Sequence, residues 1–435
     1  MISLRSCPAM LCITMLACIF LLSCSEKQVS EPPVISVTSP PAGSAYKAYD
    51  TILLTAEFSD DHKLNSVSIS LNDRNNQPVM APIFFDNPEN PFSLNAYYPI
   101  TNNAIESGTY ELQFQATDGE TVTNVFRKIE ISALVKEFLS PLIVTQNTSI
   151  LVTAYILDST KSWKEITSLQ GDYLGSQINS AFQQFYLSGR SFSALEAWDL
   201  NENKKAWRIP SVQLPHGRWF ESISYQYPYL LVSYYEGYIK GIDRWGITDF
   251  TIDVPGQFYP GICRTLGNYI VVALYSRHSN DCSLGTFHFP GGHFRQLSGN
   301  VQPPVALFPL DGHSLLLFGN DNNKMVIQYY DIETGHLIPI KEISNDSIYD
   351  IASFGKNDFF ISGKSGIYWY SYGQNSMVEF AGGINKAKLA CENVDESLYT
   401  ASGNVIRRFS VPEGVLIEEM LAPAGVVDIH LLYSK

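Results

Sequence analysis

Short runs of alternating apolar and polar residues make up much of the chain beyond residue 33. Alternation with a period of two predicts strands that are buried on one face. Turn-forming residues separate the runs, as in Ser39–Gly43 and Asp118-Gly119. The pattern predicts a β-sandwich of about seven short strands over residues 34–133. The clearest runs in this region are Val34–Val37, Thr51–Phe58, Ser66–Leu71, Tyr110–Ala116 and Val125–Ile131.

Residues 134–435 repeat a longer pattern, in which an apolar strand, a turn and further strands follow one another. A repeat of ~40–45 residues is typical of a four-stranded β-propeller blade. The region has room for about seven such repeats, so the pattern predicts a seven-bladed β-propeller. A ring of eight blades and a double β-sandwich are the alternatives. The first strands of six copies end 45, 41, 44, 44 and 40 residues apart, at Ser188, Ser233, Leu274, Phe318, Ser362 and Ser402.

The two ends of this region each carry a strand without a complete blade. Val426–Ser434 is an apolar strand with no room for a blade after it, and Ser149–Leu157 has no blade before it. Pairing the two would close the ring and remove both exposed sheet edges. We therefore expect a seventh blade that is split between the two ends, in which Val426–Ser434 pairs with the strands of Ser149–Leu157 and Trp163–Leu169.

The start of the chain has the pattern of an export signal. Arg5 is the only charged residue before Glu26, and an apolar run from Pro8 to Leu22 follows it. This run is shorter than the ~20 residues that a membrane-spanning helix needs. A basic residue, a short apolar run and a small residue before the break are typical of a secretory signal.

The end of this run, Leu21-Leu22-Ser23-Cys24, resembles the cleavage box of bacterial lipoproteins. The resemblance implies a signal peptide over residues 1–23, acyl chains on Cys24 (palmitate among them) and a tether over residues 24–33. Several acyl chains hold a protein firmly on a membrane. Ser25, in place of Asp, implies sorting to the bacterial outer membrane, with the periplasmic or the outer surface left open.

Composition narrows the classes of partner. The formal net charge is −14, 17% of residues are charged and 45% are hydrophobic. This excludes long disordered segments and a nucleic-acid partner, which requires a basic surface. Three cysteines remain beyond Cys24, namely Cys263, Cys282 and Cys391. Cys263 and Cys282 are spaced as on neighbouring strands, so either a disulfide or buried free thiols fits.

Two segments resemble known families. SGTYELQFQATDGETVTNVFRKIEI (residues 107–131) resembles the closing strands of bacterial immunoglobulin-like and polycystic-kidney-type domains. LEAWDLNENKKAWRI (residues 195–209) resembles the repeats of quinoprotein-like propellers, and Trp198-Asp199 resembles the pair of Trp-Asp-repeat blades. These resemblances imply an all-β protein, with an immunoglobulin-like β-sandwich followed by a β-propeller.

The sequence carries no nucleophile elbow and no phosphate-binding glycine loop. Asp350 and Glu221, near predicted strand starts, are candidates for a glycosidase pair, although solvated loop carboxylates fit better. Surface histidines fit better than a metal site, so we expect neither cofactor nor metal. The potential ligands lie within 16 residues and are His278, Cys282, His288 and His293.

The loops that lead into the innermost strands are the candidate binding surface. They carry side chains of the types that form interaction hot spots and stack on sugars. The same aromatic residues could instead wedge neighbouring blades together. The candidates are Arg218, Trp219, Phe258, Tyr259, Tyr349 and Lys386.

These features favour a membrane-anchored lipoprotein that binds or scaffolds a protein or glycan through its propeller face, without catalysis. The alternative is a carbohydrate-binding accessory or a carbohydrate-active enzyme of a polysaccharide-uptake system. A sensory or adhesive surface protein is a third hypothesis.

Overall fold

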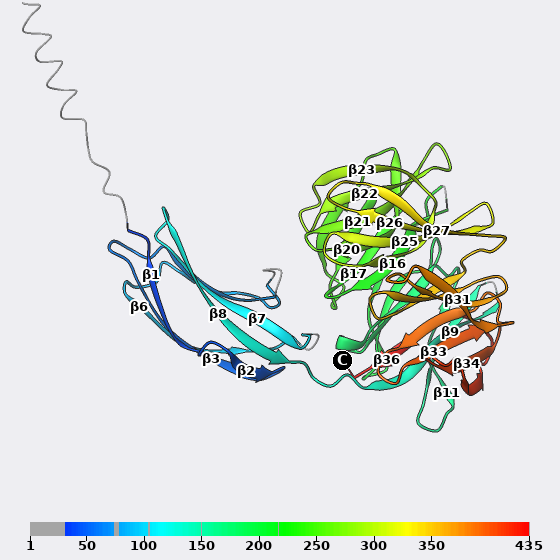
Figure 1. The fold of residues 1–435 in the computed structure, drawn as a ribbon, viewed down its shortest axis with the longest axis horizontal. Coiled ribbons are helices and arrows are strands. Elements are labelled where there is room, and N and C mark those ends of the chain that lie inside the picture. Colours follow the sequence, from blue (N-terminus) through cyan, green and yellow to red (C-terminus); the bar gives the residue numbers. More distant parts are fainter. Residues whose placement is uncertain (1–30, 74–77, 103–104, 149, 216, 435) are drawn as a thin grey trace, which may run out of the picture. The chain divides into compact units, whose positions relative to one another are not determined.

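The computed structural model describes residues 31–73, 78–102, 105–148, 150–215 and 217–434 (Figure 1). Cys24, the expected signal peptide and most of the expected tether lie outside the described residues. Strands dominate, and the one helical element among the described residues is the 3-10 turn η1 (Ser180–Phe182). The all-β prediction is confirmed. Within the described ranges, no helix is long and apolar enough to cross a bilayer.

The chain divides into two units between Leu134 and Val135. In the N-terminal unit, β3 buries Ile52, Leu54, Ala56 and Phe58 on one face and turns the alternate residues outward, as a period of two requires. Its core draws on two sheets that pack face to face. One has the order β1 (Val34–Ser39), β3 (Thr51–Ser59), β6 (Phe92–Pro99). The other has the order β2 (Ser44–Lys47), β8 (Val122–Ser132), β7 (Gly108–Thr117), β4 (Ser66–Asn72), β5 (Ile83–Asp86).

The described residues of the C-terminal unit form seven four-stranded antiparallel sheets. From first strand to fourth, the sheets are β12 (Gly175–Asn179), β13 (Gln184–Ser188), β14 (Leu195–Asp199), β15 (Lys204–Ile209); β16 (Phe220–Gln226), β17 (Tyr229–Tyr234), β18 (Tyr238–Ile242), β19 (Thr248–Asp253); β20 (Phe258–Leu266), β21 (Tyr269–Ser276), β22 (Cys282–His288), β23 (Phe294–Val301); β24 (Pro304–Pro309), β25 (Ser314–Asp321), β26 (Lys324–Asp331), β27 (Leu337–Ser344); β28 (Asp350–Phe354), β29 (Asp358–Ser362), β30 (Gly366–Ser371), β31 (Ser376–Gly382); β32 (Lys388–Glu392), β33 (Ser397–Ser402), β34 (Val405–Ser410), β35 (Leu416–Leu421); and β36 (Gly425–Tyr433), β9 (Phe138–Thr148), β10 (Leu151–Leu157), β11 (Trp163–Gln170).

The first strands of the seven sheets form a closed cycle of contacts. Each first strand from β12 to β32 contacts the first strand of the next sheet, and β36 contacts both β32 and β12. This cyclic order is the arrangement of a β-propeller. Within the last sheet, β36 pairs with β9, placing Ile429 opposite Ile143.

The expected sheet with strands from both ends of the region is present, because β36 shares it with β10 and β11. The expected direct pairing of Val426–Ser434 with Ser149–Leu157 is wrong. The second segment contains β10, which pairs with β9 and β11 instead. Pro141 and the polar end of β9 interrupt its apolar run, so the pattern does not reveal this strand.

Aromatic side chains fill the spaces between the sheets. Phe318 and Phe359, from neighbouring sheets, have ring centroids 5.1 Å apart in a single buried cluster. The buried hydroxyl of Tyr330 bonds to Thr286 Oγ1 at 2.9 Å, so this tyrosine is buried without an unsatisfied polar group.

Side chains also form hydrogen bonds with backbone groups at the edges of the first strands, where no neighbouring strand pairs. Gln226 accepts from the Thr265 N–H at 2.5 Å and donates to the Cys263 carbonyl at 2.9 Å. In the same way, Asp350 accepts from the Leu389 N–H at 2.9 Å. Such bonds satisfy backbone groups that have no ladder partner on that side.

The three cysteines among the described residues, Cys263, Cys282 and Cys391, are free. Cys263 on β20 and Cys282 on β22 are separated by β21, so the expectation that they lie on neighbouring strands is wrong. Both are buried, and burial raises the pKa of each thiol to about 12. They are therefore buried free thiols with little thiolate character.

Candidate functional site

We call the end of the ring at which the first strands begin the leading face, and the opposite end the trailing face. Because each sheet is an antiparallel meander, the leading face carries two kinds of loop. One kind precedes a first strand and the other joins a second strand to a third. The six candidate binding residues all lie in or beside loops of the first kind: Arg218, Trp219, Phe258, Tyr259, Tyr349 and Lys386.

Arg218 is held between a carboxylate and two aromatic rings. It forms an ion pair with Glu221, whose side chain is only 4% exposed. Its guanidinium carbon lies 4.9 Å from the ring centre of Tyr259 and 5.0 Å from that of Tyr235. Burial would lower the pKa of Arg218, but the hydrogen bond and charge of Glu221 outweigh it and raise that pKa.

A second arginine completes this group. The Arg277 guanidinium carbon lies 4.8 Å from the ring centre of Tyr235, and its Nη2 donates to the Tyr235 carbonyl. Tyr235 therefore contacts two cationic groups. Among the described residues, no carboxylate forms an ion pair with Arg277. We call Arg218, Glu221, Tyr235, Tyr259 and Arg277 the Arg–Tyr cluster.

The ring of Tyr259 rests on a second tyrosine. Tyr259 stacks on Tyr275 with centroids 5.5 Å apart. A Cβ atom at Gly261 would come within 2.3 Å of the Tyr275 ring, so this stack requires glycine at position 261. The Arg–Tyr cluster is thus built on a close-packed support.

The other four candidates divide into two groups. Trp219 packs against the apolar cluster between the sheets of β12 and β16, and Phe258 against the cluster between the sheets of β16 and β20. These two aromatic residues wedge sheets together. Lys386 lies 5.1 Å from the ring centre of the partly exposed Tyr349, so these two form a separate pair.

Arg277 and Tyr235 were missed in the sequence because only loops before first strands were considered. Both lie in loops between second and third strands, namely β21–β22 and β17–β18. The up-and-down order of a four-stranded repeat places these loops at the same end as the others. That order was already available from the repeat pattern.

A buried polar network lies at the same end, where β12, β28, β32 and β36 meet. Tyr173 and Ser176 both donate to Asp428 Oδ2, at 2.9 and 2.8 Å, and His430 Nε2 lies 3.5 Å from the same oxygen. Lys388 and Asp350 are close enough to influence each other's charge. The sequence pattern did not reveal this network, since Tyr173 and Asp428 lie 255 residues apart.

The two carboxylates of this network have opposite pKa shifts. Burial raises the pKa of Asp350 to about 6, with the charge of Asp428 adding to the effect and Lys388 opposing it. Burial would also raise the pKa of Asp428, but His430 and the hydrogen bonds outweigh it and hold that pKa well below its usual value. Pairs with divergent pKa values occur at acid–base sites, but both carboxylates here already accept structural hydrogen bonds.

The other candidate catalytic and metal-binding residues do not lie together. Glu221 on β16 pairs with Arg218, while Asp350 begins β28, and these strands are not neighbours in the ring. The structure therefore does not unite Asp350 and Glu221 as a glycosidase pair. His278 lies at the leading end of β22 and His288 at its trailing end. In the described part of the chain, no group of three His, Cys, Asp or Glu residues has a metal-binding arrangement.

Comparisons with known proteins give one family match, over part of the N-terminal unit. Residues 33–113 match the family model of a bacterial Ig domain. A search of curated proteins finds no match. A quinoprotein alcohol dehydrogenase-like protein from Bacteroides thetaiotaomicron is similar, with a TM-score of 0.47 and 13% identity over 92% of this chain and 99% of that chain.

Two further solved structures show a similar degree of likeness. A computationally designed protein has a TM-score of 0.47 and 14% identity over 67% of this chain and 90% of its own. A chain of a mitotic checkpoint complex has a TM-score of 0.45 and 15% identity over 57% of this chain and 79% of its own. At these scores, the three structures carry no argument about function. What the comparisons identify is a segment, residues 33–113, that is similar to bacterial Ig domains within an all-β chain.

Proposed function

We propose that this protein is an outer-membrane-anchored lipoprotein that binds a protein or glycan through the leading face of a seven-bladed β-propeller, without catalysis. The observation that carries the proposal is the Arg–Tyr cluster. It combines two guanidinium groups, two aromatic faces and a single carboxylate on the end of the ring where loops gather. Arginine and tyrosine are the residue types that contribute most to binding hot spots.

The number of blades rests on the sheets and their order. Seven four-stranded sheets, with first strands in cyclic contact, use all the strands described after Leu134. The last sheet takes β36 from the end of the chain and its other strands from the start of the unit. This arrangement supports seven blades over eight.

Two observations support the proposed lipid anchor: the sequence before Cys24 and the family match of the N-terminal unit. The Leu-Leu-Ser-Cys sequence ending at Cys24 supports lipidation, and a segment similar to bacterial Ig domains suits an exported protein. In this proposal, the N-terminal unit is a spacer between the acyl chains and the ring.

We propose no catalysis because the candidate carboxylates already form ion pairs or hydrogen bonds within the protein. Glu221 is paired with Arg218, Asp428 accepts from Tyr173 and Ser176, and Asp350 accepts from Leu389. Each therefore has a structural role, in the fold or in the Arg–Tyr cluster.

The test is a glycan array combined with a pull-down from solubilised outer membrane. The variants are Arg218→Ala and Arg277→Ala, with Arg407→Ala as the matched control. Arg407 is a partly exposed arginine that pairs with Glu419 on an outer strand, at 2.8 Å. We expect a ligand that the wild type and the control retain and that both cluster variants lose by at least tenfold. Equal retention by all four proteins, or no ligand in either assay, would overturn the proposal.

A further inference from the structure

A hollow at the trailing face contains side chains that differ from those of the Arg–Tyr cluster. It has a volume of about 320 Å³, at the lower end of the ~300–1,000 Å³ typical of small-ligand sites. It lies between the sheets of β12 and β16, far from the loops of the Arg–Tyr cluster. Its lining residues are Phe182, Gln184, Asp199, Glu202, Lys204, Ala206, Trp207, Arg244 and Trp245.

Arg244 is the central cation of this hollow. Its guanidinium carbon lies 4.5 Å from the ring centre of Phe182 and 4.1 Å from that of Trp245. Because two aromatic rings hold the guanidinium, its conformational freedom is already reduced. A guanidinium group carries five N–H donors, so Arg244 can contact both rings and still bond to a ligand.

The charges around Arg244 are already paired with other groups. Glu202 forms an ion pair with Lys204, and Asp199 accepts from the backbone N–H groups of Asn201 and Glu202 within its own turn. Within the described ranges, no carboxylate forms an ion pair with Arg244. A guanidinium with no carboxylate partner is suited to a carboxylate on a ligand, which it can bind through two parallel hydrogen bonds.

The backbone beneath Arg244 is fixed from two sides. Trp207 Nε1 and Gln184 Nε2 each donate to the Arg244 carbonyl at 3.0 Å. The Trp207 ring also lies against Gly246, where a Cβ atom would come within 2.8 Å of it. The site is therefore organised before any ligand binds, which lowers the entropic cost of binding.

Trp245 supplies a flat apolar surface beside this cation. It is 63% exposed, so its ring is accessible to a ligand. Exposed indole rings stack on the C–H faces of sugars, and the polar groups of Glu202 and Lys204 can bond to hydroxyl groups at the rim. Aromatic face, guanidinium and polar rim together match a sugar that bears a carboxylate.

We propose that this hollow binds acidic oligosaccharides that contain uronic acids, with Arg244 bonding the carboxylate and Trp245 stacking on the sugar ring. The site is separate from the leading face, so this proposal does not depend on the Arg–Tyr cluster.

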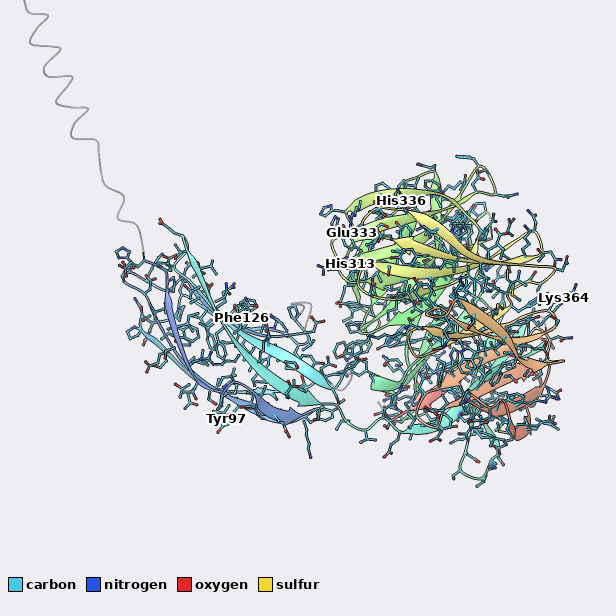
Figure 2. All side chains as sticks on the ribbon, viewed as in Figure 1. Tyr97, Phe126, His313, Glu333, His336 and Lys364 are labelled. Atoms are coloured by element: carbon cyan, nitrogen blue, oxygen red, sulfur yellow. The ribbon has the colours of Figure 1, made fainter. Side chains whose placement is uncertain are left out.

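The test is calorimetric titration of the purified protein with a galacturonic acid hexamer and with a neutral glucose hexamer. The variants are Trp245→Ala and Arg244→Gln, with Tyr97→Ala as the control. Tyr97 is a 73% exposed aromatic residue on β6 of the N-terminal unit (Figure 2). Circular dichroism and thermal unfolding of each variant establish that it is folded.

We expect the acidic hexamer to bind the wild type and the Tyr97→Ala control equally, and to bind each hollow variant at least tenfold more weakly. The neutral hexamer should bind at least tenfold more weakly than the acidic one. Three results would overturn the proposal: no binding of the acidic hexamer, equal binding by the variants, or equal binding of a glutamate hexapeptide. The last would assign the hollow to an acidic peptide.

Discussion

The Asp350 carboxylate accepts a hydrogen bond from the Leu389 N–H at 2.9 Å, which joins the first strands of two neighbouring sheets. The bond satisfies an edge group that has no ladder partner on this side of β32. It also places a carboxylate in a buried position, where burial raises its pKa to about 6. The same bond therefore contributes to ring closure and introduces a pH dependence.

The pH dependence has a definite sign. Between about pH 4 and pH 6, the unfolded chain ionises Asp350 while the folded chain keeps it protonated, because its folded pKa is raised from 3.8 to about 6. Its contribution to the free energy of unfolding is therefore present at low pH and lost as pH rises through 6, by up to about 3 kcal/mol. We expect Asp350→Asn, which can still accept from Leu389, to be more stable than the wild type at pH 8 and equal to it below pH 4.

Urea unfolding at several pH values measures this difference. Asp428→Asn is the matched comparison, because the pKa of Asp428 is lowered and its stabilisation is lost as pH falls. That variant should be less stable than the wild type at pH 8, with the gap closing in acid. The same sign of effect in both variants would contradict the assignment of the two carboxylates.

Gly246 provides a test of the packing at the trailing face. Its φ is +85°, and a Cβ atom there would lie 2.8 Å from Trp207 Cγ. We expect Gly246→Ala to lower the free energy of unfolding of the ring by about 2 kcal/mol or more. Gly256→Ala is the control, since nothing lies within 4 Å of its Cβ position. Thermal unfolding of both variants, monitored by tryptophan fluorescence, gives their unfolding midpoints. Equal midpoints would refute the close packing of Gly246 against Trp207.

Cys24 tests the proposed anchor. In Cys24→Ser, the acyl chains cannot be attached, so the protein should leave the membrane fraction. Cys18→Ser, within the expected signal peptide, should leave lipidation and fractionation unchanged. Mass spectrometry of the N-terminal peptide measures the lipid directly. An unlipidated wild-type peptide would refute the anchor.

Removal of β36 tests closure of the ring. A chain ending at Ala424 lacks the strand that pairs with β9 and loses the buried side chains of Ile429, Leu431 and Leu432. Each such side chain contributes about 1.5–3 kcal/mol when fully buried. Calorimetry should show loss of the ring transition and an unchanged transition of the N-terminal unit. A chain ending at Tyr433 is the control, and an unaltered ring transition in the shorter chain would argue against closure.

Much of the architecture could be predicted from the sequence, because strands and blades produce regular patterns of apolar residues along the chain. The spacing of the repeats located the sheets, and Val426–Ser434 was identified as a closing strand. Its partner β9 was missed, since Pro141 interrupts the apolar pattern.

Side-chain clusters whose members come from distant parts of the sequence produce no such pattern. Tyr173 and Asp428 are 255 residues apart and meet only when β36 lies beside β12. The Arg–Tyr cluster was half predicted, with Arg218 and Tyr259 found from loops before first strands. Arg277 and Tyr235 required the second kind of leading-face loop as well.

We propose that the leading face contacts a ligand in the native envelope. The most direct measurement places a benzophenone-bearing amino acid at His278, an exposed leading-face residue next to Arg277, and irradiates living cells. His336, an exposed trailing-face residue (Figure 2), is the control position. We predict a discrete cross-linked product from position 278 that disappears when Arg277→Ala is added, and no such product from position 336. No product from position 278, or the same product from both positions, would contradict the claim.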